Sequence, residues 1–198
     1  MTEGGIGRLL VVSLHQGVAD LLPSRQEFYE AWLNPANLRA GRIGLAPLAA
    51  VLSFLRQEGE SYSLVMACAG EYAADWTVGA LSSAKRRLIH AAPPVIRMVL
   101  VGWIVRGLVR GTYSPSRMDI RWKSGRAEAV LRGSIFCEVR APVGRPLCEY
   151  YAAAIRRLMD LFGLRAEVAI EHCRGVEPGS CRMVVMVVPA DAEGSAPS

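Results

Sequence analysis

The sequence contains little lysine, few aromatic residues and no long uninterrupted run of apolar residues. Lys85 and Lys123 are the only lysines, so the net charge of +5 comes from arginine. The most apolar stretch, residues 95–109, is interrupted by Arg97 and Arg106 and is shorter than the ~20 apolar residues that a membrane-spanning helix requires. We therefore expect no membrane span.

Signals for export and for nucleic-acid binding are also missing. The chain starts Met-Thr-Glu-Gly-Gly, without the basic and apolar regions of a signal peptide, which predicts a cytoplasmic protein. The arginines are scattered, and no helix-turn-helix, zinc finger or aromatic RNA-binding motif accompanies them. We expect no nucleic-acid partner and interpret the charge as a solvated basic surface that suits an anionic ligand.

Catalytic signatures are sparse. His15, His90 and His172 lie in different segments, without the spacing of a nucleophile and its base. No glycine-rich fingerprint follows a predicted strand, so a nicotinamide or flavin bound in the usual way is not indicated. These features weigh against an enzyme that works alone.

The apolar residues follow a helical period in the first half of the chain and an alternating period in much of the second. Helices are predicted over residues 6–22, 24–33, 45–57, 61–81 and 82–110, the last divided by the prolines at 93–94. Strands are predicted over residues 118–123, 127–135, 165–173 and 181–188, with a helix over 147–162 between the second and third. The predicted fold is α+β, with a helical N-terminal half packed with a mostly antiparallel four-stranded sheet and one long helix in the C-terminal half.

We expect three parts in the chain. Residues 1–93 form a helical region, and residues 189–198 form a small polar tail that we expect to be disordered. Residues 94–188, the stretch over which the chain resembles a known family, are expected to form a ligand- and metal-binding unit. Within the helical region, Ser24 and Glu27 are spaced as a capping box, and Gly70 and Gly79 are spaced for close packing of a helix against a neighbour.

Four of the five cysteines lie in the last third of the sequence, at predicted structural junctions. Cys137 ends a strand, Cys148 opens a helix, and Cys173 and Cys181 flank a tight hairpin; Cys68 stands apart and is interpreted as a small buried hydrophobe. In a reducing compartment, clustered cysteines favour metal or redox chemistry over disulfides. Zinc suits such a site because it accepts sulfur ligands in tetrahedral geometry. The alternative is a set of buried cysteines without a ligand.

The cysteine pattern resembles that of the 4-vinyl-reductase domain family over about residues 94–188. The shared features are Pro-Leu-Cys at residues 146–148, the helix that follows, and Cys-Arg-Gly at residues 173–175 with another cysteine at 181. The family is a small-molecule-binding domain of bacteriochlorophyll-synthesis vinyl-reductase-type proteins and of aromatic-responsive sensors, and is similar in fold to vesicle-tethering subunits with a hydrophobic channel. The resemblance implies zinc ligands at Cys148, Cys173 and Cys181, and a homodimer.

The fourth ligand departs from the family pattern. Zinc-bearing members supply a glutamate three residues before the middle cysteine, where this chain has Ile170. Glu171 and His172 are close by in sequence, and we favour Cys137, which would complete a sulfur-only site. Three possibilities stay open: an all-cysteine zinc site, an iron–sulfur or other metal centre, or a lost site.

A zinc ion with four protein ligands has no open position and is structural, so function would reside in an apolar cavity. Trp103, Trp122, Phe136 and Tyr151 are the candidates to line it, although each is also a plausible core residue. The favoured function is a binding or carrier protein for an apolar or tetrapyrrole-like molecule. The alternatives are a reductase or redox factor of (bacterio)chlorophyll or tetrapyrrole biosynthesis with the cysteines as active centre, and a dimerisation or scaffold module.

Overall fold

The computed structural model describes residues 5–32, 44–123, 125–139 and 141–188. Their helices are α1 (Arg8–Leu21), α2 (Gln26–Trp32), α4 (Leu45–Gln57), α5 (Ser61–Gly79), α6 (Ser83–Ala91), α7 (Pro94–Thr112) and α8 (Glu149–Leu161). The strands are β1 (Arg117–Lys123), β2 (Arg126–Arg132), β3 (Ala166–His172) and β4 (Cys181–Val187). Short 3₁₀ helices cover Pro23–Arg25 and Ile135–Cys137.

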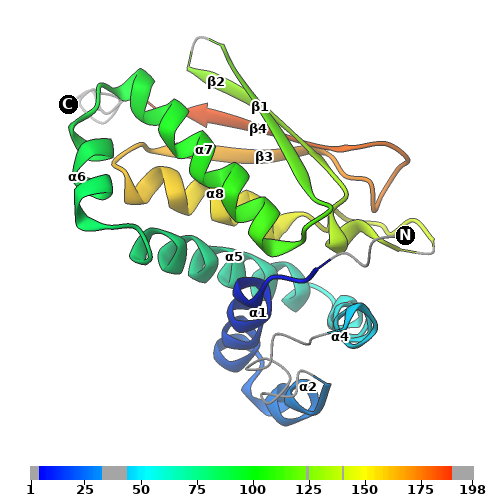
Figure 1. The fold of residues 1–198 in the computed structure, drawn as a ribbon. Coiled ribbons are helices and arrows are strands. Elements are labelled where there is room, and N and C mark those ends of the chain that lie inside the picture. Colours follow the sequence, from blue (N-terminus) through cyan, green and yellow to red (C-terminus); the bar gives the residue numbers. More distant parts are fainter. Residues whose placement is uncertain (1–4, 33–43, 124, 140, 189–198) are drawn as a thin grey trace, which may run out of the picture.

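The sheet is antiparallel throughout, with the strand order β1-β2-β4-β3. Helices α7 and α8 cover one of its faces, α5 packs on α8, and α1 packs on α5 (Figure 1). Helix α2 lies at the end of the molecule farthest from the sheet, and α4 packs on it (Figure 1). The predicted α+β fold, with its helical first half and its four-stranded sheet, is confirmed.

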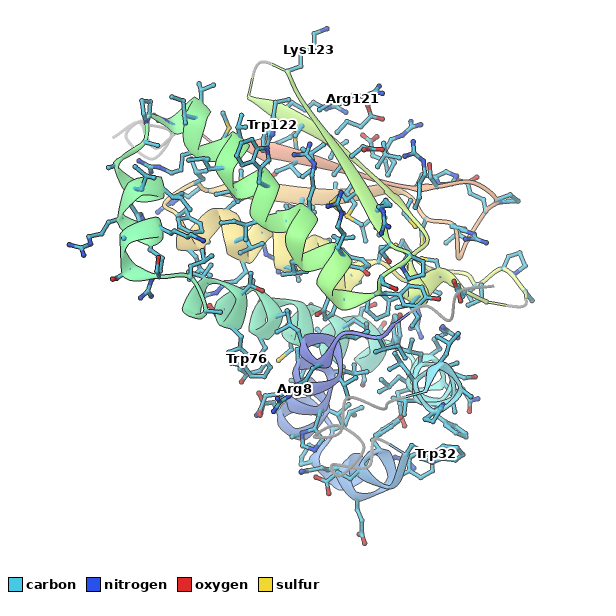
Figure 2. The ribbon with its side chains drawn as sticks, in the orientation of Figure 1. Arg8, Trp32, Trp76, Arg121, Trp122 and Lys123 are labelled. Carbon is cyan, nitrogen blue, oxygen red and sulfur yellow. The ribbon has the colours of Figure 1, made fainter. Side chains whose placement is uncertain are left out.

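Alternation along the strands decides which residues face the helices. On β1, Met118 and Ile120 are buried while their neighbours are exposed, as the two-residue period of a strand requires. Arg121 and Lys123 extend outward from this strand, whereas Trp122 lies toward α7 (Figure 2). The outer face of the sheet is therefore charged.

Serine and proline set the starts of the two helices of the 82–110 segment. The Ser82 side chain accepts a hydrogen bond from the backbone N–H of Lys85 at 3.3 Å and caps α6. Pro94 is the first residue of α7, where its missing N–H costs nothing. The predicted division at the two prolines is confirmed.

Helices α5 and α8 pack closely where a glycine faces the partner backbone. A Cβ atom on Gly70 would overlap the carbonyl oxygen of Tyr150 and lie 3.2 Å from the amide nitrogen of Ala154. The predicted close-packing role is confirmed for Gly70. It is wrong for Gly79, where a Cβ would meet nothing within 4 Å. Nine residues of helix place Gly79 on the opposite, exposed side of α5 from Gly70.

Strand β2 is shorter than predicted, and this corrects the setting of one cysteine. Gly133 has a φ of +67° and turns the chain, so the strand ends at Arg132 and Cys137 ends a 3₁₀ helix instead of a strand. The Ser24 capping side chain is not observed either, because Ser24 lies within a 3₁₀ helix that has no side-chain cap. The predicted end of the second helix at residue 33, the turn residue at 124 and the tail from 189 to 198 lie outside the described residues.

None of the helices in the described parts of the chain is both long enough and apolar enough to cross a membrane.

Candidate metal centre

Four cysteines meet at the junction of the sheet and the start of α8. Cys137 comes from the 3₁₀ helix after β2, Cys148 is the residue before α8, Cys173 follows β3 and Cys181 begins β4. The hairpin of β3 and β4 brings the last two together, and the chain between β2 and α8 delivers the first two. The junction positions expected for Cys148, Cys173 and Cys181 are the observed ones.

The sulfur atoms are close enough to share one ion. Sγ of Cys137 lies 3.1 Å from that of Cys148, 3.5 Å from that of Cys173 and 3.5 Å from that of Cys181. The Cys148 and Cys173 sulfurs are 3.7 Å apart, and all four lie within 4.8 Å of one another. A tetrahedral ion with Zn–S bonds of about 2.3 Å places its sulfurs about 3.8 Å apart, so the spacing fits a single ion.

The sulfurs are shielded from water and receive backbone donors. All four cysteines are free and buried, with at most 2% of their surface exposed. The amide of Leu147 donates to Sγ of Cys173 at 3.2 Å, and that of Arg174 donates to Sγ of Cys181 at 3.4 Å. Cys148 also lies at the positive end of the α8 dipole. These donors stabilise negative sulfur, which is the form that binds a metal.

Mutual hydrogen bonding sets the protonation of the thiols. Hydrogen bonds from neighbouring thiols, that of Cys137 first, hold the pKa of Cys173 well below its usual range. Hydrogen bonding to Cys137 and the other two thiols, together with burial, raises the pKa of Cys148. The cluster therefore concentrates negative charge on some sulfurs and protons on others, and a divalent cation could replace those protons.

A second layer of polar residues surrounds the cluster. Nη2 of Arg56 on α4 donates to the carbonyl oxygen of Phe136 at 3.2 Å, next to Cys137. The hydroxyl of Tyr62 on α5 donates to the carbonyl oxygen of Leu147 at 3.3 Å, next to Cys148. The guanidinium of Arg56 brings positive charge toward the thiols, and both contacts fix ligand-bearing backbone. Nothing in the sequence marked these residues, because the contacts span 80 and 85 positions of the chain.

The other residues near the expected fourth ligand lie elsewhere. Ile170 packs against the hydrophobic core. Glu171 forms an ion pair with Arg126 at 3.1 Å, and His172 forms one with Glu177 at 3.2 Å. None of the three belongs to the group of side chains close enough to share an ion. The fourth side chain of that group is Cys137.

The four aromatic residues predicted to line a cavity do not lie together. Phe136 and Tyr151 are fully buried and their ring centroids are 5.3 Å apart. Trp122 packs near Gly102 of α7, and Trp103 is 63% exposed on the outside of that helix. Phe136 and Tyr151 therefore form core, and ligand contact by any of the four stays a prediction.

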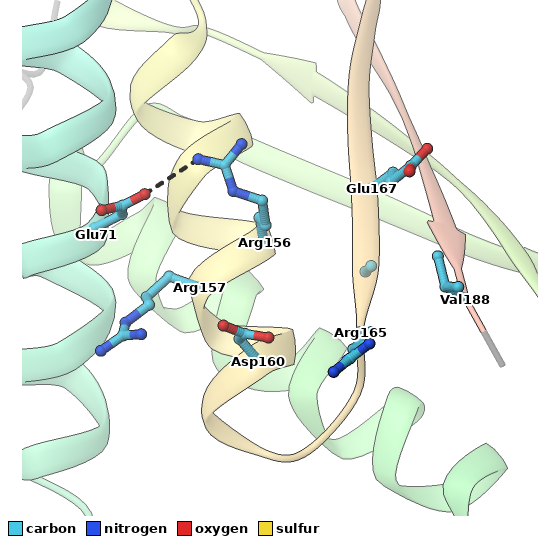
Figure 3. A pocket seen from close by; sticks show the side chains of 8 residues that line it. Glu71, Arg156, Arg157, Asp160, Arg165, Glu167 and Val188 are labelled. Atoms are coloured by element: carbon cyan, nitrogen blue, oxygen red, sulfur yellow. Dashed lines mark hydrogen bonds and ion pairs between the residues drawn. The ribbon is translucent and has the colours of Figure 1, made fainter. Parts of the chain in front are cut away.

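Several hollows lie on the surface of the described structure. One of about 430 Å³ lies beside α5, α8 and β3, but its walls are charged (Figure 3). Arg156 in this hollow pairs with Glu71 at 3.1 Å, and Arg157 pairs with Asp75 at 3.0 Å. Another, of about 470 Å³, has more apolar walls; they are formed by Pro94, Asp160, Gly163, Leu164, Arg165, Val187 and Val188.

Comparison with known proteins finds similarity to solved structures but not to a sequence family or a curated protein. No family model matches the sequence, and no curated protein matches it. A solved structure that is similar has a TM-score of 0.60 and 12% identity, and the match covers 93% of this chain and 98% of the other. It is an H-NOX protein from K. algicida, described as an Fe(II) unliganded mutant. At this identity the likeness concerns the fold.

Histidine is a common ligand of iron, the metal named for that relative, but the histidines of this chain lie apart. His15 pairs with Glu30 at 3.0 Å, His172 pairs with Glu177, and the ring of His90 lies 5.2 Å from that of Phe162. The three histidines thus have separate surroundings. Among the described residues, the histidine, cysteine and carboxylate side chains that come close enough to share one ion are the four cysteines.

Proposed function

We propose that this protein binds one zinc ion through Cys137, Cys148, Cys173 and Cys181, and that the ion is a structural element of a small-molecule-binding protein. The observation that carries the zinc proposal is the set of four buried sulfurs within 4.8 Å of one another. Four thiolates leave no open coordination position, so the ion holds the start of α8 to the β3–β4 hairpin. The proposal assumes the reducing cytoplasm that the sequence predicts.

The spacing of the sulfurs favours a single ion over an iron–sulfur cluster. In a cluster at least some of the cysteines bind different irons, which holds those sulfurs farther apart than ligands of one ion. Here all four sulfurs lie within 4.8 Å of one another. The burial of all four sulfurs also argues against a redox centre that meets a substrate directly. A reductase that uses this cluster as its active centre is therefore the weaker alternative.

Metal analysis tests the proposal. We expect about one zinc ion per chain and a colourless protein, because zinc has a filled d shell. Cys148→Ser and Cys137→Ser should each lose most of the metal, whereas Cys68→Ser, which removes the cysteine outside the cluster, should retain it. Elemental analysis and an absorption spectrum of each purified variant measure this. Equal metal in Cys137→Ser and wild type would refute the four-cysteine site, and a coloured iron protein would refute zinc.

The ligand that we propose is an apolar or tetrapyrrole-like molecule. The hollow of about 470 Å³ at the junction of α7, α8 and β4 falls in the size range of small-molecule sites. Pro94, Leu164, Val187 and Val188 give it apolar walls. The resemblance to the 4-vinyl-reductase domain family supports the same ligand class and a homodimer, which light scattering would test.

A substitution in the wall of the hollow tests whether the ligand binds there or elsewhere on the surface. We expect Val187→Arg to weaken binding of protoporphyrin about tenfold or more, because it places a charge and added volume against an apolar wall. Met186→Arg is the matched control, since Met186 is the preceding residue of β4 and is exposed outside this hollow. Fluorescence titration with protoporphyrin measures both. Equal weakening by the two variants, or no binding to folded wild type, would contradict the proposal.

A further inference from the structure

Helices α6 and α7 carry an unusual distribution of charge. Between Asp75 and Asp119 the sequence has no acidic residue. The basic residues of this segment are Lys85, Arg86, Arg87, Arg97, Arg106, Arg110 and Arg117. The two helices therefore form the most one-sidedly basic part of the chain, although the protein as a whole is only modestly basic.

Some of these basic side chains bind backbone carbonyl groups of the protein, and others make no ion pair within the described residues. Arg97 donates to the carbonyl oxygens of His90, Ala92 and Phe162, and Arg106 donates to that of Ile120. Four other cations are exposed and take part in no ion pair within the described residues; they are Lys85, Arg86, Arg87 and Arg110. These four are available to an external partner.

Large apolar side chains are exposed beside these cations. Leu88 on α6 is 70% exposed, and Val95, Ile96, Val99 and Trp103 on α7 are exposed as well. Ile96, Val99 and Trp103 lie at helical spacing on one side of α7, and Arg110 continues the same side. Helix α6 buries only Ile89. We call the exposed apolar and basic residues of α6 and α7 the α6–α7 face. Helix α6 lies at the edge of the molecule away from α2 and α4, and α7 runs from it across the helical side of the sheet (Figure 1).

We propose that the α6–α7 face binds the surface of an anionic lipid membrane. Helices that lie in the membrane interface combine exposed leucine and tryptophan with lysine and arginine, and they do not need the length of a spanning helix. Indole rings favour the boundary between headgroups and acyl chains, so Trp103 has a place there. The free cations suit lipid phosphates and carboxylates, and no acidic residue of the segment opposes them.

The charge distribution argues against two other occupants. A second copy of the chain docked through the same face would bring two sets of unpaired cations together. An interface with another protein carries about one hydrogen bond per 100–200 Å², yet the exposed side of α7 from Ile96 to Trp103 offers only apolar side chains. A lipid surface supplies both the negative charge and the apolar layer.

Vesicle co-sedimentation tests this proposal. We expect the wild type to bind vesicles of phosphatidylcholine mixed with phosphatidylserine and to bind pure phosphatidylcholine at least tenfold more weakly. A basic residue near an anionic surface contributes about fivefold to binding, so Arg86→Glu with Arg87→Glu should lower binding at least 25-fold. Added salt should also weaken binding of the wild type to anionic vesicles, because salt screens the attraction between the cations and the lipid charges.

Two matched controls separate the face from general effects of charge and exposed apolar surface. Trp103→Ser should lower binding about tenfold or more, whereas Leu64→Ser, at a residue that is 62% exposed on α5, should not. Arg8→Glu with Arg121→Glu makes the same charge change on α1 and β1 and should bind as the wild type does. Circular dichroism verifies that each variant is folded.

Three results would overturn the proposal. One is a folded wild type that does not bind anionic vesicles. Another is loss of binding in the Leu64→Ser control equal to that in Trp103→Ser. The third is a dimer in light scattering that Trp103→Ser converts to a monomer, which would assign the face to a second copy of the chain.

Discussion

Removal of bound zinc is expected to lower the free energy of unfolding by more than ~5 kcal/mol, because in a structural site the free energy of metal binding is part of that of folding. The four ligands join the turn after β2, the start of α8 and both ends of the β3–β4 connection. Without the ion, four buried sulfurs would have to share protons among themselves in a space suited to one cation. Chelation should therefore loosen the whole junction at once.

Urea unfolding with and without a zinc chelator measures this effect. The chelator should move the midpoint of the wild type strongly to lower urea, and zinc added in excess should restore it. Cys68→Ser should respond to the chelator as the wild type does, because Cys68 lies on α5 outside the cluster. Cys181→Ser should respond little, since it has already lost a ligand. Superimposable curves for the wild type with and without chelator would contradict a structural metal.

Gly70→Ala is expected to lower the free energy of unfolding by about 3 kcal/mol, because overpacking at a close contact forces the backbone apart. The new Cβ would overlap the carbonyl oxygen of Tyr150, which is backbone and cannot move aside alone. Alanine favours a helix over glycine by about 1 kcal/mol, so the packing cost must exceed this gain. The sign of the result therefore reports the contact between α5 and α8 directly.

Gly79→Ala on the same helix is the control. A Cβ there meets nothing within 4 Å, so its effect should be neutral or slightly stabilising. The measurement is urea unfolding of both variants by circular dichroism, with metal content determined in parallel. Gly70→Ala should also bind zinc more weakly, because α8 follows directly after Cys148. Equal stability of the two variants would show that α5 and α8 can separate freely at Gly70.

Local patterns in the sequence were sufficient to predict most of the fold. The helix over residues 45–57 has the predicted bounds, and the prolines at 93–94 divide two helices as expected. Period and proline chemistry act within a few residues, so they can be read from sequence alone. The predicted end of β2 was wrong because apolar residues continue in the sequence past Gly133. The strand ends before this glycine, which has a φ of +67° and turns the chain.

The four cysteines of the candidate site could be predicted from the sequence, because they cluster at the ends of predicted helices and strands. Four of them fall at junctions of elements, and junctions at one end of a sheet lie close together. The surrounding layer was not predictable, because Arg56 and Tyr62 reach the site from helices in the other half of the chain. The aromatic residues show the same limit: alternation and helical spacing do not distinguish a core residue such as Phe136 from an exposed one such as Trp103.

The strand order β1-β2-β4-β3 also determines when these parts can form during synthesis. Strand β4 is the last in sequence but pairs with both β2 and β3, so β3 has no partner in the sheet until β4 has been made. Cys181 is the first residue of β4 and the last of the four cysteines to leave the ribosome. A nascent chain that ends before this strand therefore lacks the strand that pairs with β2 and β3 and has three of the four cysteines of the cluster. The sheet and the cysteine cluster are completed together in one late step.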